Sequence, residues 1–226
     1  MDVHRFYGAL MRGFRMRRMR RFAAQFRPGP DTRILDVGGS AFNWELAGIE
    51  ARVTLLNLTP PRHVPEQPDP FCDVRASGTA LPYRERAFDV AFSNSVIEHV
   101  GSFDEQARFA AELRRVATGL WVQTPARSFP LETHLLSPFF HFLPRAWQAR
   151  LVRNFTLWGW LTRPSPDEAR RFVAQTRLLG YGEMRRLFPD CEIRRERFLG
   201  LTKAFVAVRR PPGRTAGDVV PRGVPA

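Results

Sequence analysis

The chain has 226 residues, of which 44% are hydrophobic and 25% charged, and its formal net charge is +13 at pH 7. These values are typical of a folded globular protein with one domain, and they exclude a disordered chain. No apolar run reaches the roughly 18 residues of a membrane-spanning helix, and the basic start lacks the apolar segment of a signal peptide. Two cysteines form neither a disulfide framework nor a metal-binding pair, so we expect a cytoplasmic protein.

The positive charge is concentrated at the two ends of the chain. Residues 1–30 hold eight Arg and one Asp, or +7, and residues 209–226 hold four Arg and one Asp, or +3, which leaves +3 for the middle. Basic ends favour anionic partners such as a lipid surface or a nucleic acid. A codon bias explains the charge equally well, because all but one of the 35 basic residues are arginines.

The first part of the chain predicts a helix followed by alternating strands and helices. Residues 4–26 have apolar side chains three, four and eight positions apart with arginines between them, which indicates a basic amphipathic helix. A Pro-rich linker ends at Pro70. Strands alternating with helices predict an α/β fold with a doubly wound, mostly parallel sheet. We expect these elements at residues 34–37, 43–49, 53–58, 88–93, 103–116 and 119–124.

The second part of the chain departs from this alternation. Residues 129–162 form an insertion rich in aromatic residues and punctuated by prolines, and a helix is expected over 167–188. Two strands at 191–197 and 202–208 are expected to pair as an antiparallel hairpin. The expected organisation is an N-terminal helix (1–30), an α/β domain (31–210) and a disordered tail (211–226).

A candidate ligand-binding loop follows the first strand. Asp36 ends the strand, and the chain turns through Gly38, Gly39 and Ser40. Glycine lets the backbone approach a ligand closely, and a carboxylate accepts hydrogen bonds from a ligand amine or from the loop itself. An ordinary strand-to-helix turn explains these residues equally well. The G-x-G-x-x-G pattern of a dinucleotide site is absent, which argues against a nicotinamide-dependent oxidoreductase.

Several motifs follow the loop in a fixed order. Asn57 ends the second strand about twenty residues later, where a nucleoside-binding sheet places a polar group that reads the ribose. Cys72-Asp73-Val74, Ala80-Leu81-Pro82-Tyr83 and the segment from Phe88 to Val100 come next. This order resembles the class I S-adenosylmethionine-dependent methyltransferase family over residues 31–125. The segment from Gln123 to His134 is similar to an uncharacterised bacterial branch of type 11-like methyltransferases, which implies a Rossmann-like sheet.

The resemblance also implies a cofactor, S-adenosyl-L-methionine, and residues that hold it. These residues are Asp36, Gly38, Gly39 and Ser40 in the loop, Asn57 and Leu58 at the ribose, Asp73 and Val74 at the adenine, and Ser93, Asn94 and Ser95 at the end of the fourth strand. The sequence departs from the family pattern in the loop, where two of the usual glycines are replaced. It departs again at Asn57, where the family has an acid.

Two histidines are candidate catalytic bases. Methyl transfer needs mainly proximity and alignment, and a base is required if the acceptor is a hydroxyl or amine that must lose its proton. His99 and His134 are the candidates, although His99 would also suit a backbone hydrogen bond and His134 a structural contact within the insertion. We expect no metal, because Ser95 stands where a metal-binding E-x-x-E-H segment has its first glutamate.

The insertion suggests what the protein binds. Residues 139–161 interleave Phe and Trp with Arg, a mixture that suits a membrane interface or a lid over the substrate. We therefore expect a small-molecule, glycan or lipid-linked acceptor that is methylated on oxygen. An anionic membrane surface is the second expected partner, bound through residues 1–27 and 139–161 at the inner face of the membrane.

Two other interpretations remain open at this point. The first is a catalytically degenerate methyltransferase fold that associates with membranes or with a partner protein, suggested by the replaced glycines and by Asn57. The second is a nucleic-acid partner, against which the absence of a recognisable RNA-binding module argues. The sequence patterns leave the oligomeric state open.

Overall fold

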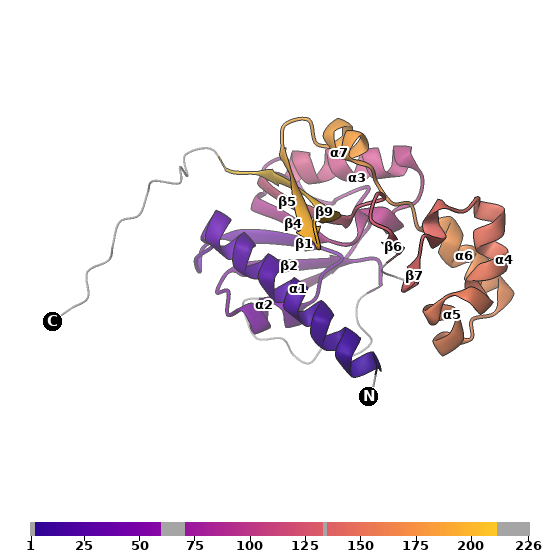
Figure 1. Cartoon of the computed structure of the whole chain (residues 1–226). Coiled ribbons are helices and arrows are strands. Elements are labelled where there is room, and N and C mark those ends of the chain that lie inside the picture. Colours follow the sequence, from indigo (N-terminus) through magenta and orange to yellow (C-terminus); the bar gives the residue numbers. More distant parts are fainter. Residues whose placement is uncertain (1–2, 60–70, 133–134, 212–226) are drawn as a thin grey trace.

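The computed structural model describes residues 3–59, 71–132 and 135–211, with side chains from residue 13 onward. A seven-stranded sheet forms the centre, in the order β3-β2-β1-β4-β5-β9-β8 (Figure 1). The first five strands are parallel, and β9 is antiparallel to both β5 and β8. This confirms the predicted doubly wound α/β fold with its C-terminal hairpin. The strands are β1 (Arg33–Val37), β2 (Arg52–Asn57), β3 (Phe71–Arg75), β4 (Phe88–Asn94), β5 (Ala117–Pro125), β8 (Glu192–Phe198) and β9 (Leu201–Arg209).

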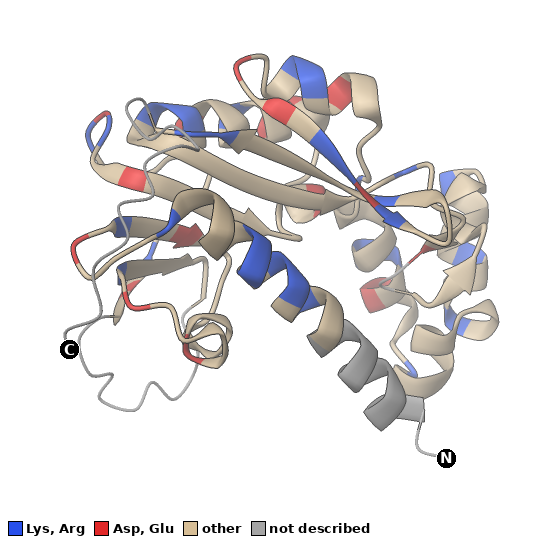
Figure 2. Cartoon of the chain, turned by 60° about the vertical axis from the view of Figure 1, so that its left-hand side comes forward, with Lys and Arg blue, Asp and Glu red and all other residues tan. Residues whose placement is uncertain are grey.

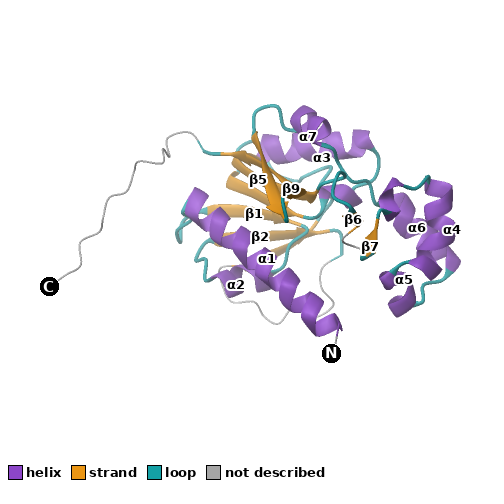
Figure 3. Cartoon of the chain, in the orientation of Figure 1, coloured by secondary structure: helices purple, strands orange, loops and turns teal. Residues whose placement is uncertain are grey.

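Helices cover both faces of the sheet, with a separate apolar cluster on each side (Figure 3). Phe22 and Phe92 belong to the first cluster, and Phe109 and Val122 belong to the second. Because both faces are buried there, the central strands β1, β2, β4 and β5 read as nearly continuous apolar runs, which is why their positions were predictable. The covering helices are α1 (Val3–Phe26) and α2 (Ala41–Ala47) on the first face, and α3 (Phe103–Val116) and α7 (Tyr181–Leu187) on the second.

The helix expected over residues 167–188 is two helices, α6 (Pro166–Gln175) and α7. The helical prediction fails between them because the chain there pairs with other segments. The Arg177 N–H donates to the Glu98 carbonyl at 2.7 Å, and Leu179 bridges to the end of β5. Gly180 then begins α7, where the Glu183 carboxylate accepts its N–H. Tertiary hydrogen bonds thus replace those of a continuous helix.

The aromatic insertion folds beside the carboxyl ends of the parallel strands (Figure 1). Its helices and α6 share a small apolar cluster of their own, which includes Leu135, Phe140 and Val152. We call this group, residues 135–175, the lid. No helix in the described part of the chain is long and apolar enough to cross a membrane. Within or before the lid lie β6 (Leu131–Glu132), β7 (Ser137–Pro138), the 3-10 turn η2 (Phe140–Phe142), α4 (Arg145–Phe155) and α5 (Leu157–Thr162).

The N-terminal helix contributes directly to the core of the α/β domain. Met19, Phe22 and Phe26 are at most 2% exposed and belong to the cluster on the first face of the sheet. Arginines follow one another along its described part (Figure 2). Phe22 and Phe26, which lie within the segment expected to bind a membrane surface, therefore contact the protein's own sheet. The expected tail lies outside the described residues, apart from Pro211.

We expect Phe22→Ala to lower the free energy of unfolding by about 3–5 kcal/mol, the usual cost of truncating a buried phenylalanine. The ring is fully buried and contacts four other aromatic rings. Urea denaturation measures the change. Arg20→Ala, at an exposed position on the same helix, is the control and should change stability by about 0.5 kcal/mol or less. Equally small losses for the two variants would contradict a core role for the helix.

Candidate functional site

The strand order reverses between β1 and β4, which lie side by side at the centre of the sheet. Open α/β sheets bind ligands outside the carboxyl ends of the strands at such a point. The predicted loop lies there, because Asp36 is the penultimate residue of β1. Ser93 ties the two strand ends together, since its hydroxyl donates to the Val37 carbonyl at 3.1 Å.

Asp36 is a buried carboxylate with one unsatisfied oxygen. Its side chain is enclosed, with 1% of the residue exposed, and its Oδ2 accepts a hydrogen bond from the Trp44 indole N–H at 2.8 Å. Its Oδ1 accepts none from the residues that the structure describes. Burial raises the pKa of Asp36 to about 7, and the Trp44 hydrogen bond opposes this rise.

The two glycines are each required by their surroundings. Gly38 has a φ of +79°, which favours glycine, and a side chain there would meet Val96 at 2.4 Å. A Cβ on Gly39 would lie 1.7 Å from the Asp36 Oδ2. The loop backbone therefore covers the carboxylate at a distance that glycine alone permits. Ser40 begins α2 in an extended conformation and makes no side-chain cap hydrogen bond.

The ends of β2 and β3 form the adjacent part of the carboxyl edge of the sheet. The Asn57 side-chain amide donates to the Gly39 carbonyl at 3.1 Å, so Asn57 holds the loop. Leu58, which follows, is 71% exposed. Arg75 is paired with Asn57 in the register of the sheet, and its guanidinium donates to the Leu58 carbonyl at 3.2 Å.

Asp73 and Val74 come before the end of β3, so they are set back from the carboxyl edge of the sheet. They are paired with Leu55 and Leu56, so Asp73 is two positions before Arg75. Sequence reasoning missed Arg75, and it missed β3 itself, although the Arg that follows Cys72-Asp73-Val74 was visible in the sequence. The structure thus brings Asp36, Gly39 and Asn57 into contact, while Asp73 lies one strand further out.

The end of β4 is held by β5. Ser95 has a φ of +59°, which is unusual for a residue with a side chain. Its N–H donates to the Gln123 carbonyl at 3.0 Å, and its hydroxyl donates to the Gln123 Oε1 at 2.9 Å. Gln123 is 1% exposed, and its Nε2 has no hydrogen-bond partner among the described residues. Strained residues and unsatisfied buried groups of this kind cluster at functional sites.

Charged side chains join the N-terminal helix to the same edge. Arg18 donates to the Asn94 Oδ1 at 3.1 Å and forms an ion pair with Glu196 at 2.9 Å. Lys203, which is 8% exposed, has its Nζ 3.1 Å from the centre of the Phe14 ring. Burial and the Arg18 charge lower the pKa of Lys203 to about 8, while Glu196 opposes this shift. None of these long-range contacts was visible in the sequence.

The candidate base His99 lies beyond the end of β4, in the 3-10 turn η1 (Ile97–His99). It is exposed, and its Nδ1 is 3.5 Å from the Thr176 hydroxyl. Its neighbour Glu98 is fully buried and accepts a hydrogen bond from the Thr124 hydroxyl at 2.9 Å. His134 lies outside the described residues. Within the described ranges, no three His, Cys, Asp or Glu side chains are grouped as metal ligands.

Known protein families and solved structures resemble this chain over different lengths. A model of the methyltransferase domain family matches residues 35–119. No curated protein sequence matches the chain. One similar solved structure is the 1,6-didemethyltoxoflavin-N1-methyltransferase of Burkholderia thailandensis, with bound 1,6-didemethyltoxoflavin and S-adenosylhomocysteine. The identity is 15%, the TM-score is 0.53, and the alignment covers 93% of this chain and 91% of that one.

Two further structures share the fold. The N-terminal domain of EvdMO1 with bound S-adenosylhomocysteine is 17% identical, with a TM-score of 0.50 over 87% of this chain and 81% of that one. A Rhodobacter sphaeroides protein named as a zinc-dependent alcohol dehydrogenase is 12% identical, with a TM-score of 0.53 over 80% of this chain and 84% of that one. Residues 35–119 are thus similar to the methyltransferase domain family, and the sheet with its reversal point is the fold that these solved structures share.

Proposed function

We propose that the chain binds S-adenosylmethionine across the carboxyl ends of β1, β2 and β4 and methylates a small-molecule, glycan or lipid-linked acceptor on oxygen. The observation that carries the proposal is the Asp36 carboxylate, which has an unsatisfied oxygen beneath a two-glycine loop. The cofactor, when bound, supplies an electrophilic methyl group on a sulfonium, and its amine and sulfonium are both cationic. A buried anion at this edge suits such a ligand.

The remaining predicted residues have roles that their positions support. Asn57 holds the loop through its amide N–H, which leaves its amide oxygen for a ribose hydroxyl. The exposed Leu58 offers an apolar surface beside it. Asp73 and Val74 are proposed to contact the adenine, and Arg75 lies nearer the carboxyl edge of the sheet. Ser93, Asn94 and Ser95 close the site at β4.

Methylation of a hydroxyl needs a group that accepts its proton. As the acceptor oxygen bonds to the methyl carbon, the carbon–sulfur bond breaks and the hydroxyl proton moves to a base. His99 is exposed at the end of β4, beside Thr176, and it is our proposed base. His134 is the second proposed base, on the basis of the sequence resemblance.

Calorimetry with S-adenosylhomocysteine tests the proposed cofactor site. We expect micromolar binding by the wild-type chain, weakened about tenfold by Asn57→Ala, because one or two hydrogen bonds at the loop are lost. Asn154→Ala, at an exposed position in α4, should bind as the wild type does. Absence of binding by the wild-type chain would contradict the proposal and favour a degenerate methyltransferase fold.

A membrane-associated function is a second candidate, favoured by the exposed rings of the lid. Trp147 is 58% exposed, and Phe155 and Trp160 are each 67% exposed. Such rings together with nearby arginines suit an anionic lipid interface. Flotation with phosphatidylglycerol vesicles tests this, and the double variant Trp147→Ala/Trp160→Ala should float less than the wild type. Wild-type protein that stays at the bottom of the gradient would contradict it.

A further inference from the structure

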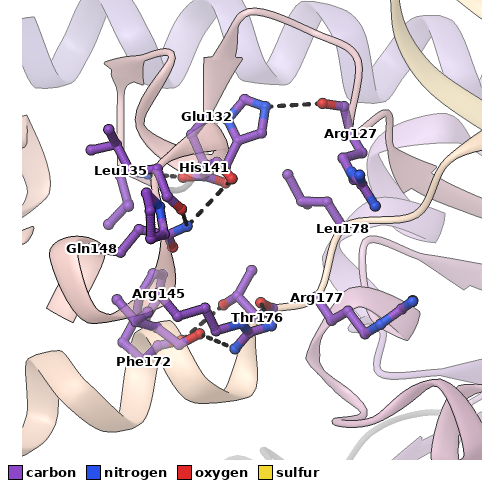
Figure 4. Close-up of a pocket in the computed structure, with 13 residues that line it drawn as sticks. Arg127, Glu132, Leu135, His141, Arg145, Gln148, Phe172, Thr176, Arg177 and Leu178 are labelled. Atoms are coloured by element: carbon purple, nitrogen blue, oxygen red, sulfur yellow. Dashed lines mark hydrogen bonds between the residues drawn. The ribbon is translucent and has the colours of Figure 1, made fainter.

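A pocket of ≈ 350 Å³ lies between the lid and the carboxyl edge of the sheet. Figure 4 shows its polar side chains, which come from the turn after β5, from η2, from α4 and from the end of α6. Leu135, Phe172 and Leu178 add apolar walls. The volume is within the range of small-molecule sites, which is about 300–1,000 Å³. Its polar lining includes Arg127, Glu132, His141, Arg145, Thr176 and Arg177.

Two of the three arginines in this pocket form no ion pair with an acidic side chain among the described residues. Arg145 donates to the carbonyls of Val173, Ala174 and Thr176 at 2.8, 3.1 and 3.3 Å, which fixes the guanidinium without neutralising it. The Arg127 side chain is exposed, and within the described part of the chain it forms no hydrogen bond or ion pair. Its charge does contribute to lowering the pKa of Glu183.

Two acidic groups lie at or beside the pocket. Glu183 is ion-paired with Arg177, the third arginine. Glu132 is 2% exposed, and its Oε2 accepts the Leu135 N–H at 2.6 Å. The His141 ring bonds through its Nε2 to the Arg127 carbonyl at 2.9 Å, which holds the turn that carries Arg127. Three arginines against the carboxylates of Glu132 and Glu183 leave a formal charge of +1 on the side chains at and beside the pocket.

Residues of the pocket wall contact the turn that follows β4, near which the methyl group would be delivered. The Thr176 hydroxyl, on its wall, is 3.5 Å from the His99 Nδ1. The adjacent Arg177 N–H donates to the Glu98 carbonyl. Thr176 therefore lies between the pocket and the proposed base His99. Arg127 and Arg145 repel a cationic group at their end of the pocket.

We propose that this pocket binds the methyl acceptor and that the acceptor carries an anionic group, a carboxylate or a phosphate, held by Arg127 and Arg145. The inference rests on the proposed methyltransferase function and names its substrate class. Guanidinium groups bind planar carboxylate and phosphate oxygens through paired hydrogen bonds. The apolar walls offer a hydrophobic surface to the rest of the acceptor.

Binding of small probes to the full chain saturated with S-adenosylhomocysteine tests the inference. Phenyl phosphate and benzoate are the anionic probes, one for each source of charge, and benzamide is the neutral one. By calorimetry, we expect at least one anionic probe to bind and benzamide to bind about tenfold more weakly or not at all. Arg127→Gln should weaken the anionic probe about tenfold.

Two further variants separate the pocket from the general charge of the protein. Arg150→Gln removes one charge from an exposed position of α4 that does not line the pocket, and it should change probe affinity less than twofold. Arg145→Lys keeps the charge but loses the planar fork, and it should weaken the probe. Equal losses for Arg127→Gln and Arg150→Gln would overturn the inference, as would equal binding of benzamide. Absence of S-adenosylhomocysteine binding by the wild-type chain would instead overturn the proposed function.

Discussion

Asp36→Asn is expected to stabilise the ligand-free protein at pH 8 and to weaken S-adenosylhomocysteine binding at least tenfold. Both effects have one cause, the burial of a carboxylate whose pKa is raised from 3.8 to about 7. Each pKa unit corresponds to about 1.4 kcal/mol, so the ionised group costs roughly 4 kcal/mol of folding free energy at most. Asparagine keeps an acceptor for Trp44 but carries no charge. The ammonium group of the ligand recovers this cost only when the carboxylate is present.

The pH dependence follows from the direction of this shift. Below about pH 4 the group is protonated in both the folded and the unfolded chain, so it does not affect stability. Between pH 4 and 7 the unfolded chain ionises while the folded chain stays protonated, so stability falls as pH rises. Above pH 7 the penalty is complete. Ligand affinity should show the opposite trend and rise from pH 6 to pH 8, because the ligand binds the ionised form of Asp36.

Thermal unfolding at pH 5 and pH 8, with and without S-adenosylhomocysteine, measures both effects. For a chain of this length, a gain of 2–4 kcal/mol raises the melting temperature by roughly 5–15 °C. We expect this at pH 8 and a smaller gain at pH 5, where only part of the penalty has developed. Asp31→Asn is the matched control, because the side chain of Asp31 is 98% exposed. A variant that binds as tightly as the wild type at pH 8 would exclude Asp36 from the cofactor site.

The sequence predicted the parts of the fold that local pattern determines. The buried strands β1 and β4 are short apolar runs, and α3 matches its predicted bounds because Ser102 and Glu105 form a capping box at its start. The strand β3 was missed because it lies at the edge of the sheet and is partly exposed, so it has no apolar run. The break between α6 and α7 was missed because backbone partners far along the chain decide it.

In the candidate site, too, local sequence predicted some features and distant contacts decide the others. Asp36 and the glycines were found because a strand end, a carboxylate and a turn are adjacent in sequence. The contacts that give those residues their properties join distant positions, such as Arg18 with Asn94, which are 76 positions apart. The register that places Arg75 beside Asn57 is likewise a property of the sheet. A single sequence predicts which groups are available, whereas burial and register decide which of them are unsatisfied.

Gly39→Ala is expected to abolish measurable S-adenosylhomocysteine binding and to destabilise the chain by about 3 kcal/mol or more. The added Cβ would lie 1.7 Å from the Asp36 Oδ2 and 2.1 Å from its Cγ, so the loop or the carboxylate must move. Gly182→Ala, a position where a Cβ meets nothing within 4 Å, is the control and should leave binding unchanged.

A double variant distinguishes the two consequences of this clash. Asp36→Ala removes the atoms that the new Cβ would meet, so Gly39→Ala should cost much less stability in the Asp36→Ala background than in the wild type. Binding should stay lost in the double variant, because the carboxylate that would attract the cofactor is gone. If Gly39→Ala is equally destabilising in both backgrounds, the loop does not rest on Asp36. If the double variant binds S-adenosylhomocysteine as the wild type does, the buried carboxylate serves the fold alone, and the cofactor is held by the ends of β2 and β4.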